Sequence, residues 1–341
     1  MKLKSLLTTL SIFALSAALL VDADAQPRDK RAQTTMKFLS VSTNARATGM
    51  GTAVTAIETK SSYGQFYNPA TIARLDRSFD ASFGLVNWIA DIDYNMGSVA
   101  WRPADGRYGV FGLQFVSTDY GEIDETILGA GEKGYYRLGT FRPNAWAAGI
   151  SYARALTGRF SVGANLKYAN LDLGTGTHGL SGDGDLERSD YEEGTMVVDF
   201  GVHYQTGFES LNFAMSVRNF APDISFNEED SELPLTFRIG VAMDMMDLFD
   251  GIDQNMHSFN LSIDANRPRD FDEQLIIGGE YTFMNAFSVR AGYGFPTDTE
   301  QISAGFGIRQ SLGSVELSID YSYTTFDVFD NVDTFSIQLG F

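Results

Sequence analysis

Residues 334–341 read T-F-S-I-Q-L-G-F and end the chain on an aromatic side chain. Successive side chains of an extended strand point to opposite faces, so one face here is wholly apolar and the other is small or polar. This period of two predicts a strand with one face in an apolar medium. The apolar face consists of Phe335, Ile337, Leu339 and Phe341.

A strand of this kind suits the closing position of a transmembrane β-barrel, because the last strand must pair with the first to leave no open edge in lipid. The stretch also resembles the C-terminal strand by which bacterial outer-membrane proteins are recognised for insertion. The resemblance implies two partners, outer-membrane lipid and the barrel assembly machinery. We therefore expect a bacterial outer-membrane protein whose N-terminus and C-terminus both lie in the periplasm.

The first residues have the pattern of a secretory signal peptide. Lys2 and Lys4 precede an apolar run over residues 6–21, and an A-D-A cleavage site ends at Ala25. We predict that residues 1–25 are removed. No other stretch approaches the run of about 20 apolar residues that a membrane helix requires. Any membrane span must therefore be made of strands.

Composition limits the function further. The chain of 341 residues has 25 basic and 44 acidic residues, and its formal charge of −19 argues against nucleic acid as a partner. It has no cysteine, which excludes disulfides and thiolate metal sites. Aromatic residues at 13% and 34 glycines suit a membrane barrel with aromatic girdles and tight turns. We expect no cofactor.

Alternation of apolar and polar residues begins after Arg77 and continues to the end of the chain. We predict that residues 78–341 form an all-β, transmembrane antiparallel barrel of about 14 strands, an even number within the bacterial range. The predicted strands lie near 78–89, 92–101, 107–118, 144–155, 159–170, 195–205, 209–219, 235–245, 256–266, 274–284, 286–295, 300–310, 313–324 and 333–341.

The connections between these strands differ in length on the two sides of the predicted barrel. Connections after even-numbered strands are mostly short, as at 102–106, 156–158, 284–285 and 311–313. Connections after odd-numbered strands are mostly longer, as at 119–143, 171–194, 220–234 and 325–332. Residues 246–255 are an exception. Short periplasmic turns and long outer loops are typical of a transmembrane barrel.

Residues 26–77 do not alternate, and we predict that they form a lead-in and a hatch inside the lumen. The small residues Gly49 and Gly51 permit close approach to other backbone, and Asn68-Pro69 predicts a turn. The segment resembles the opening of the PorV/PorQ family, whose members are barrels similar to FadL-type fatty acid transporters. The matching positions are Phe38-Leu39, Ala45-Arg46-Ala47, Gly49-Met50-Gly51 and Asn68-Pro69-Ala70.

This resemblance implies a hatch within a fourteen-stranded barrel and leaves two functions open. PorV-like members serve type IX secretion and handle exported proteins, so exported proteins or secretion components would be partners. FadL-like members carry hydrophobic small molecules across the outer membrane. Inward positions that are mostly polar, together with long acidic loops, favour the secretion function over a conduit for greasy ligands.

Charged residues at inward positions carry both signs, which argues against a pore selective for one sign of ion. We interpret them as ion pairs that bind the hatch to the wall, with Arg46 facing an inward carboxylate. The alternative is a polar path for a ligand. The inward residues are Lys167, Asp199, Arg218, Arg238, Asp264, Glu280, Arg290, Arg309 and Asp320.

Neither catalysis nor metal binding is indicated. Asp199 and His203 are four residues apart on one predicted strand, a separation of about 13 Å that is too long for a hydrogen bond. We therefore expect no enzyme. Asp183, Asp185 and Glu187 place oxygen ligands at alternate positions of one loop. They could bind a divalent cation, but the loop lacks the glycine and the closing glutamate of an EF-hand, and we favour a solvated acidic loop.

Overall fold

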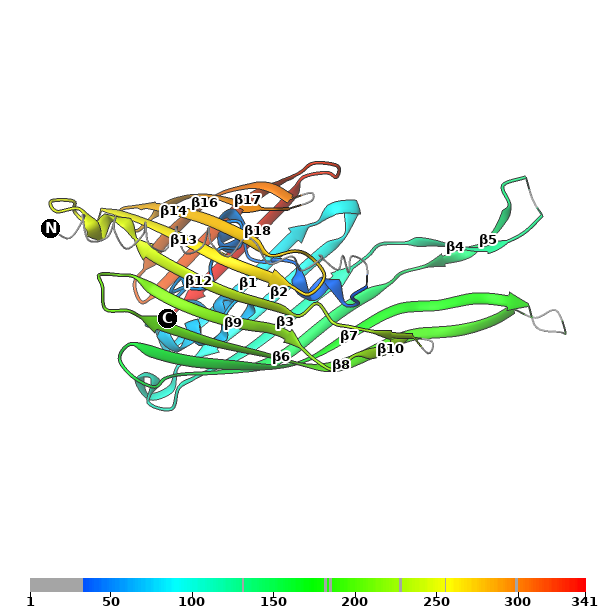
Figure 1. Cartoon of the computed structure of the whole chain (residues 1–341), viewed down its shortest axis with the longest axis horizontal. Coiled ribbons are helices and arrows are strands. Elements are labelled where there is room, and N and C mark those ends of the chain that lie inside the picture. Colours follow the sequence, from blue (N-terminus) through cyan, green and yellow to red (C-terminus); the bar gives the residue numbers. More distant parts are fainter. Residues whose placement is uncertain are drawn as a thin grey trace, which may run out of the picture.

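The computed structural model describes residues 33–130, 132–180, 183, 186–226, 229–254, 256–297 and 300–341. These residues form a closed antiparallel barrel with a segment of chain inside it (Figure 1). The predicted signal peptide lies outside the described ranges. Within those ranges, no helix has the length and apolar character needed to cross a membrane.

Fourteen strands close the barrel, as the alternation predicted, and each overlaps one predicted range. In chain order they are β1 (Phe79–Asn87), β2 (Asp93–Trp101), β3 (Val110–Asp119), β6 (Asn144–Ala155), β7 (Phe160–Leu180), β8 (Leu186–Gln205), β9 (Asn212–Phe220), β12 (Thr236–Asp244), β13 (His257–Pro268), β14 (Gln274–Phe283), β15 (Phe287–Phe295), β16 (Glu300–Leu312), β17 (Val315–Phe326) and β18 (Val332–Gly340).

The last strand closes the barrel by pairing with β17 on one side and β1 on the other. Phe335 lies opposite Leu85, and Ile337 lies opposite Phe83. Leu339 is 42% exposed on the outer surface, whereas the polar residues between these positions are buried against the interior. The ring of Phe341 stacks on that of Phe79, with centroids 4.9 Å apart. The outer face of the closing strand is therefore apolar and its inner face polar.

The two ends of the barrel are very different (Figure 1). At one end, here called the turn end, most strands are joined by tight turns such as 156–159 and 313–314. At the other end, here called the ribbon end, β7 and β8 continue well beyond the wall. A second ribbon of β4 (Ile123–Leu128) and β5 (Tyr135–Phe141) projects beside them, and β10 (Ile224–Phe226) pairs with β11 (Glu229–Ser231).

The sequence predicted these ribbons only as long loops. Alternation identifies a strand when one face is buried and the other is not. The β4–β5 ribbon is exposed or half-buried along its whole length, so no buried face marks it in the sequence. The exceptional long connection at the turn end contains the short helix η6 (Met245–Leu248). Two further short helices, η4 (Ile89–Asp91) and η5 (Pro103–Gly106), lie in connections.

The hatch, residues 33–77, runs through the interior from the ribbon end to the turn end. It begins at Thr34, which bridges to Glu232 beside β11, and ends where Arg77 pairs with Glu316 at the start of β17. Its elements are η1 (Lys37–Ser40), α2 (Ala45–Gly49), η2 (Ser62–Phe66) and η3 (Pro69–Arg74). Thr34 and Phe341 thus lie at opposite ends of the barrel, whereas the sequence placed both termini on one side; residues 1–32 are outside the described ranges.

Glycines in the wall allow the hatch to lie directly on the strands. A Cβ atom added to Gly292 would lie 2.0 Å from the backbone nitrogen of Gly51. One added to Gly201 would lie 1.9 Å from Oδ1 of Asn68, which also caps η3 by accepting from the Ala70 backbone nitrogen. Contacts this short exclude any larger side chain unless the hatch moves. The fit of hatch to wall therefore depends on small residues from both.

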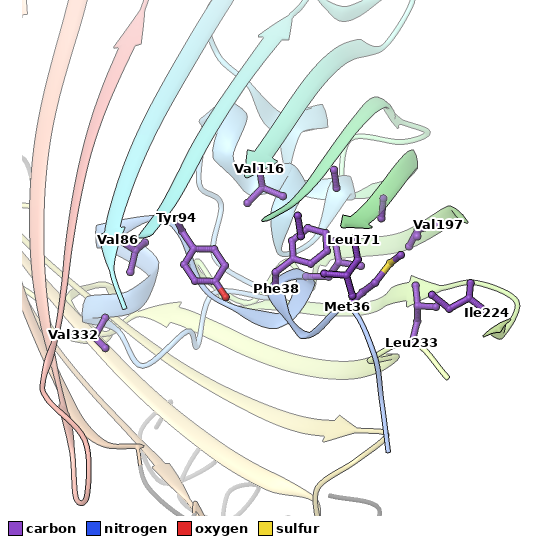
Figure 2. Close-up of a cluster of buried hydrophobic side chains, with 14 residues drawn as sticks. Met36, Phe38, Val86, Tyr94, Val116, Leu171, Val197, Ile224, Leu233 and Val332 are labelled. Atoms are coloured by element: carbon purple, nitrogen blue, oxygen red, sulfur yellow. The ribbon is translucent and has the colours of Figure 1, made fainter. Parts of the chain in front are cut away.

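Apolar side chains cover the mouth of the barrel at the ribbon end (Figure 2). Met36 and Phe38 of the hatch are 2% and 1% exposed, and they pack against residues from the strand ends and from the loop before β12. We call this group the mouth cluster; its labelled members are Met36, Phe38, Val86, Tyr94, Val116, Leu171, Val197, Ile224, Leu233 and Val332. Packed apolar side chains of the hatch and the strand ends therefore occupy the mouth.

Candidate functional site

The first hatch contact is a buried ion cluster around Arg46. Asn44 caps α2 through its side chain, which accepts from the Ala47 backbone nitrogen, and the helix presents Arg46 to the wall. The Arg46 guanidinium binds both carboxylate oxygens of Glu280, at 2.8 and 2.7 Å. Arg290 lies 2.6 Å from Glu280 and 2.7 Å from Asp320. Two arginines thus alternate with two carboxylates.

The two hatch residues of this cluster do not change their protonation near neutral pH. Burial alone would lower the pKa of Arg46, but the carboxylate of Glu280 outweighs burial and holds that pKa well above its usual value. Tyr63 lies 3.2 Å from Arg46, and burial raises the pKa of its phenol to about 12. Both hatch residues therefore keep one protonation state over the physiological range. Arg46 is a fixed attachment rather than a pH switch.

The second contact lies beside a cluster of wall residues around Asp199. Its carboxylate lies 2.9 Å from Lys167 and accepts hydrogen bonds from the Asn165 side chain at 2.9 Å and the Asn219 backbone at 2.8 Å. Arg218 donates to the hatch through the Leu39 carbonyl at 3.3 Å. Lys167, Asn165 and Asn219 together satisfy the hydrogen-bonding capacity of the Asp199 carboxylate, which therefore has a structural role.

His203 has a separate role in the same region. Its Nε2 atom lies 3.1 Å from the carbonyl oxygen of Ala56 in the hatch, and its side chain is fully buried. Asp199 is bound by Lys167 and the two asparagines instead, so the structure gives these two residues no shared site. His203 is a wall residue that contacts the hatch backbone.

The third contact uses backbone groups of the hatch. Asp264 accepts from the Thr55 backbone nitrogen at 3.1 Å, and Arg238 donates to the Thr52 carbonyl at 2.8 Å. Arg238 is also held by Asn266 at 3.0 Å. Charged wall residues here bind backbone groups of residues 50–57, a loop of the hatch that contains no charged side chain. Four of the predicted inward residues thus contact the hatch, whereas Lys167 and Asp199 pair with each other within the wall: the four are Arg218, Arg238, Asp264 and Glu280.

Arg309 differs from the other predicted inward residues. Its side chain is 35% exposed and lies 3.5 Å from Glu316 near the turn end. There it borders a cavity of 490 Å³ beneath the hatch. Four basic and four acidic residues line this cavity, so it has no net charge: Arg46, Lys60, Arg77 and Arg309, with Glu58, Asp76, Glu280 and Glu316. Such a polar space offers little to a hydrophobic ligand.

The ribbons are the largest structures outside the barrel. The Thr177 hydroxyl of β7 donates to Glu125 of β4 at 2.6 Å, which ties the two ribbons together. Ion pairs of 2.6 Å join Arg137 to Asp124 and Arg142 to Asp119. Leu128 is 91% exposed at the tip of β4. The ribbons therefore present a large, exposed and mainly acidic surface.

The predicted cation site is only partly described. Asp183 and Glu187 lie in or beside the β7–β8 ribbon, and both are exposed, whereas Asp185 lies outside the described residues. Within the described ranges, no three acidic or histidine side chains come together as a metal site.

Sequence reasoning missed several hatch contacts because they depend on tertiary placement. Tyr63 belongs to no recognisable sequence motif, yet its hydroxyl accepts a hydrogen bond from Arg46. Asn219 has a φ of 60° and binds Lys167 at 3.0 Å through its side chain. Asparagine adopts this left-handed conformation more readily than most residues. An asparagine near the end of a predicted strand was therefore the one available indication that the backbone turns at Asn219.

Comparison with known families assigns the chain to a family of membrane proteins. A family model described as "Type IX secretion system membrane protein PorP/SprF" matches residues 135–341, more than half of the chain. The chain belongs to this family. The type IX secretion association implied by the hatch resemblance is thereby confirmed, although the matching family is PorP/SprF rather than PorV/PorQ. The match begins after the hatch, which contains the motifs that suggested PorV/PorQ. No curated protein matches the chain.

Solved structures show the same fold as this PorP/SprF family member. The CymD monoaromatic hydrocarbon channel is 12% identical, with a TM-score of 0.57 over 88% of this chain and 98% of that chain. The toluene transporter TbuX of Ralstonia pickettii is 13% identical, with a TM-score of 0.58 over 87% and 98%. A FadL homologue of Pseudomonas aeruginosa is 12% identical, with a TM-score of 0.52 over 87% and 97%. These identities establish a FadL-like outer-membrane barrel fold and no more.

Proposed function

We propose that this outer-membrane barrel handles exported proteins in type IX secretion, as the PorV/PorQ resemblance first suggested, and that its ribbons are the binding surface. The ribbon end faces the outside of the cell and the turn end faces the periplasm. The observation that carries the proposal is the filled lumen: the mouth cluster, three charged contacts and the wall glycines all hold the hatch in place.

A partner must then bind outside the barrel, and the ribbons offer the surface for it. Their strands have outer edges that do not belong to the barrel wall, and such edges can pair with a strand of another protein. Exposed Leu128, Tyr135 and Tyr136 provide apolar area of the kind that is enriched in protein interfaces. Surrounding carboxylates favour a partner with a basic surface.

A conduit for hydrophobic molecules is the second candidate, because the fold is that of hydrocarbon channels. The polar lining and small volume of the interior spaces argue against a conduit for such molecules. The 490 Å³ cavity is lined by charged and polar groups, and the space between Phe38, Leu39, Tyr67 and Arg218 is only 30 Å³. Transport by this route would require the hatch to leave its charged contacts.

Shortening the ribbons tests the proposal without disturbing the barrel. Asp119 and Asn144 are paired in the wall, so a four-residue turn can replace residues 121–142. Asp172 and Glu192 are likewise paired, so a turn can replace residues 173–191. We expect a normal heat-modifiable barrel with a loss of surface-attached exported proteins. A control that neutralises the carboxylates but keeps both ribbons separates charge from strand pairing.

Gene deletion distinguishes the two candidate functions. We expect the deletion strain to lose exported proteins from its surface and to take up fatty acids and toluene at the normal rate. Loss of uptake with an unchanged surface proteome would refute the secretion role. A surface proteome unaffected by ribbon shortening would place the binding surface elsewhere.

A further inference from the structure

Two hollows mark the lipid-facing surface of the barrel near the turn end. The larger has a volume of 730 Å³ and lies over β2, β3, β6 and β7, and the smaller has a volume of 400 Å³ and lies over β18, β1, β2 and β3. They share Val99 and Leu113, so they are neighbours. Small outward residues create them: Ala164 lines the larger, and Gly97, beside which an added Cβ would meet nothing within 4 Å, lines the smaller.

A row of aromatic rings borders the hollows on the side of the turn end. Trp101 and Phe111 have ring centroids 6.1 Å apart, and Phe111 and Tyr152 have centroids 5.2 Å apart. Phe79 lies opposite Trp101 across the β1–β2 pair and continues the row. Aromatic rows of this kind mark the level at which lipid headgroups meet hydrocarbon. The hollows therefore lie at the depth of the acyl chains.

A basic patch lies directly beyond this aromatic row. Arg102 and Arg107 are in the β2–β3 turn, and Arg154 and Arg159 flank the β6–β7 turn. Residues 102–109 and 154–159 together contain a single carboxylate, that of Asp105. Arg107, Arg154 and Arg159 are exposed. The patch is notable in a chain whose formal charge is −19. It occupies the headgroup level directly beside the hollows.

We propose that this face binds an anionic phospholipid, with one acyl chain in each hollow and the phosphate beside Arg102, Arg107 and Arg154. Lipid acyl chains fill the hollows because this part of the barrel surface faces the hydrocarbon core of the membrane. Arginine binds phosphate through several N–H donors at once, and its charge favours a net-negative headgroup over a zwitterionic one. The hatch and the ribbons contribute nothing to this site, so it is independent of the proposed secretion role.

Trp101 provides a direct probe, because it is 53% exposed and lines the larger hollow. The full-length barrel is placed in phosphatidylcholine nanodiscs that contain a small fraction of lipid brominated on its acyl chains. Subtracting the spectrum of Trp101→Phe removes the signals of the other tryptophans. We expect brominated phosphatidylglycerol to quench Trp101 at a lower mole fraction than brominated phosphatidylcholine, by about fivefold for each arginine that contacts the phosphate.

The triple variant Arg102→Gln, Arg107→Gln, Arg154→Gln should abolish this preference while leaving quenching by phosphatidylcholine unchanged. A matched triple change of exposed arginines at the ribbon end provides the control and should keep the preference: Arg137→Gln, Arg188→Gln and Arg267→Gln.

Gly97→Phe fills the smaller hollow without changing charge, so native mass spectrometry should show weaker retention of phosphatidylglycerol. Equal quenching of the unaltered barrel by the two brominated lipids would overturn the proposal. So would a preference that survives the triple variant. Protection of Trp101 from both lipids would indicate a protein on this face and would also overturn it. A heat-modifiable band verifies that each variant is folded.

Discussion

Replacing Glu280 with glutamine removes the charge that joins the hatch to the wall. Glu280 is 2% exposed and lies between Arg46 of α2 and Arg290 of β15. In the variant, Arg290 retains Asp320 at 2.7 Å, whereas Arg46 keeps only neutral partners. The change should therefore act mainly on the hatch side of the cluster.

The cost follows from burial. Removing one partner of a buried ion pair leaves an uncompensated charge and costs about 3–5 kcal/mol. Barrel strands keep their own ladder of hydrogen bonds, so we expect this cost to weaken hatch seating rather than to unfold the wall. Glu316→Gln is the matched control, because its side chain is 25% exposed and its pair with Arg77 should contribute about 1 kcal/mol or less.

Planar-bilayer conductance measures the opening of the hatch, and gel mobility after heating measures the integrity of the barrel. We expect Glu280→Gln to give frequent conductance openings and Glu316→Gln to remain nearly silent. Adding Arg46→Met to Glu280→Gln should recover part of the loss, because it removes the stranded charge. If Glu280→Gln is as closed as the unaltered barrel, or if its effect and that of Arg46→Met simply add, the cluster does not hold the hatch.

Three further predictions concern the same architecture. Gly201→Val should displace η3 and raise conductance, because even a Cβ there would lie 1.9 Å from Asn68, whereas Gly97→Ala in open space should behave as the unaltered protein. Cysteines at Lys133 and Arg188 should be labelled on intact cells, and those at Gly158 and Asp250 only after lysis; equal labelling would refute the orientation. The difference in conductance between Glu280→Gln and the unaltered barrel should not change between about pH 6 and 9, because the raised pKa of Arg46 keeps its ion pair intact below that pKa and Tyr63 stays neutral below about pH 12.

The barrel could be predicted from sequence because lipid imposes a strict rule on each strand. Outward residues such as Val315, Leu317 and Ile319 must be apolar, and the residues between them face a polar interior. That alternation is local, so it can be read without knowing which strands are neighbours. The inward charges could be predicted by the same rule, since Asp264 and Glu280 fall on polar faces.

The route of the hatch is not encoded in any local pattern. Arg46 could be expected to face a carboxylate, but its choice of Glu280 depends on where α2 lies, and that depends on wall glycines such as Gly278 and Gly292. A glycine that faces the hatch and one that faces lipid, such as Gly97, are indistinguishable in sequence. For the same reason, no local pattern in the sequence predicts that Thr34 lies at the ribbon end.

The closeness of the hatch to the wall also bears on function. A gate that opens for each molecule of substrate needs contacts that break at modest cost. The structure instead combines a buried ion pair, hydrogen bonds from charged wall residues and backbone packed on glycine. Breaking the Arg46–Glu280 pair would leave a buried charge uncompensated, at a cost of about 3–5 kcal/mol. The hydrogen bonds from charged wall residues to the hatch backbone at Leu39 and Thr55 would have to open with it. A surface that works from outside avoids this cost, and the ribbons supply such a surface.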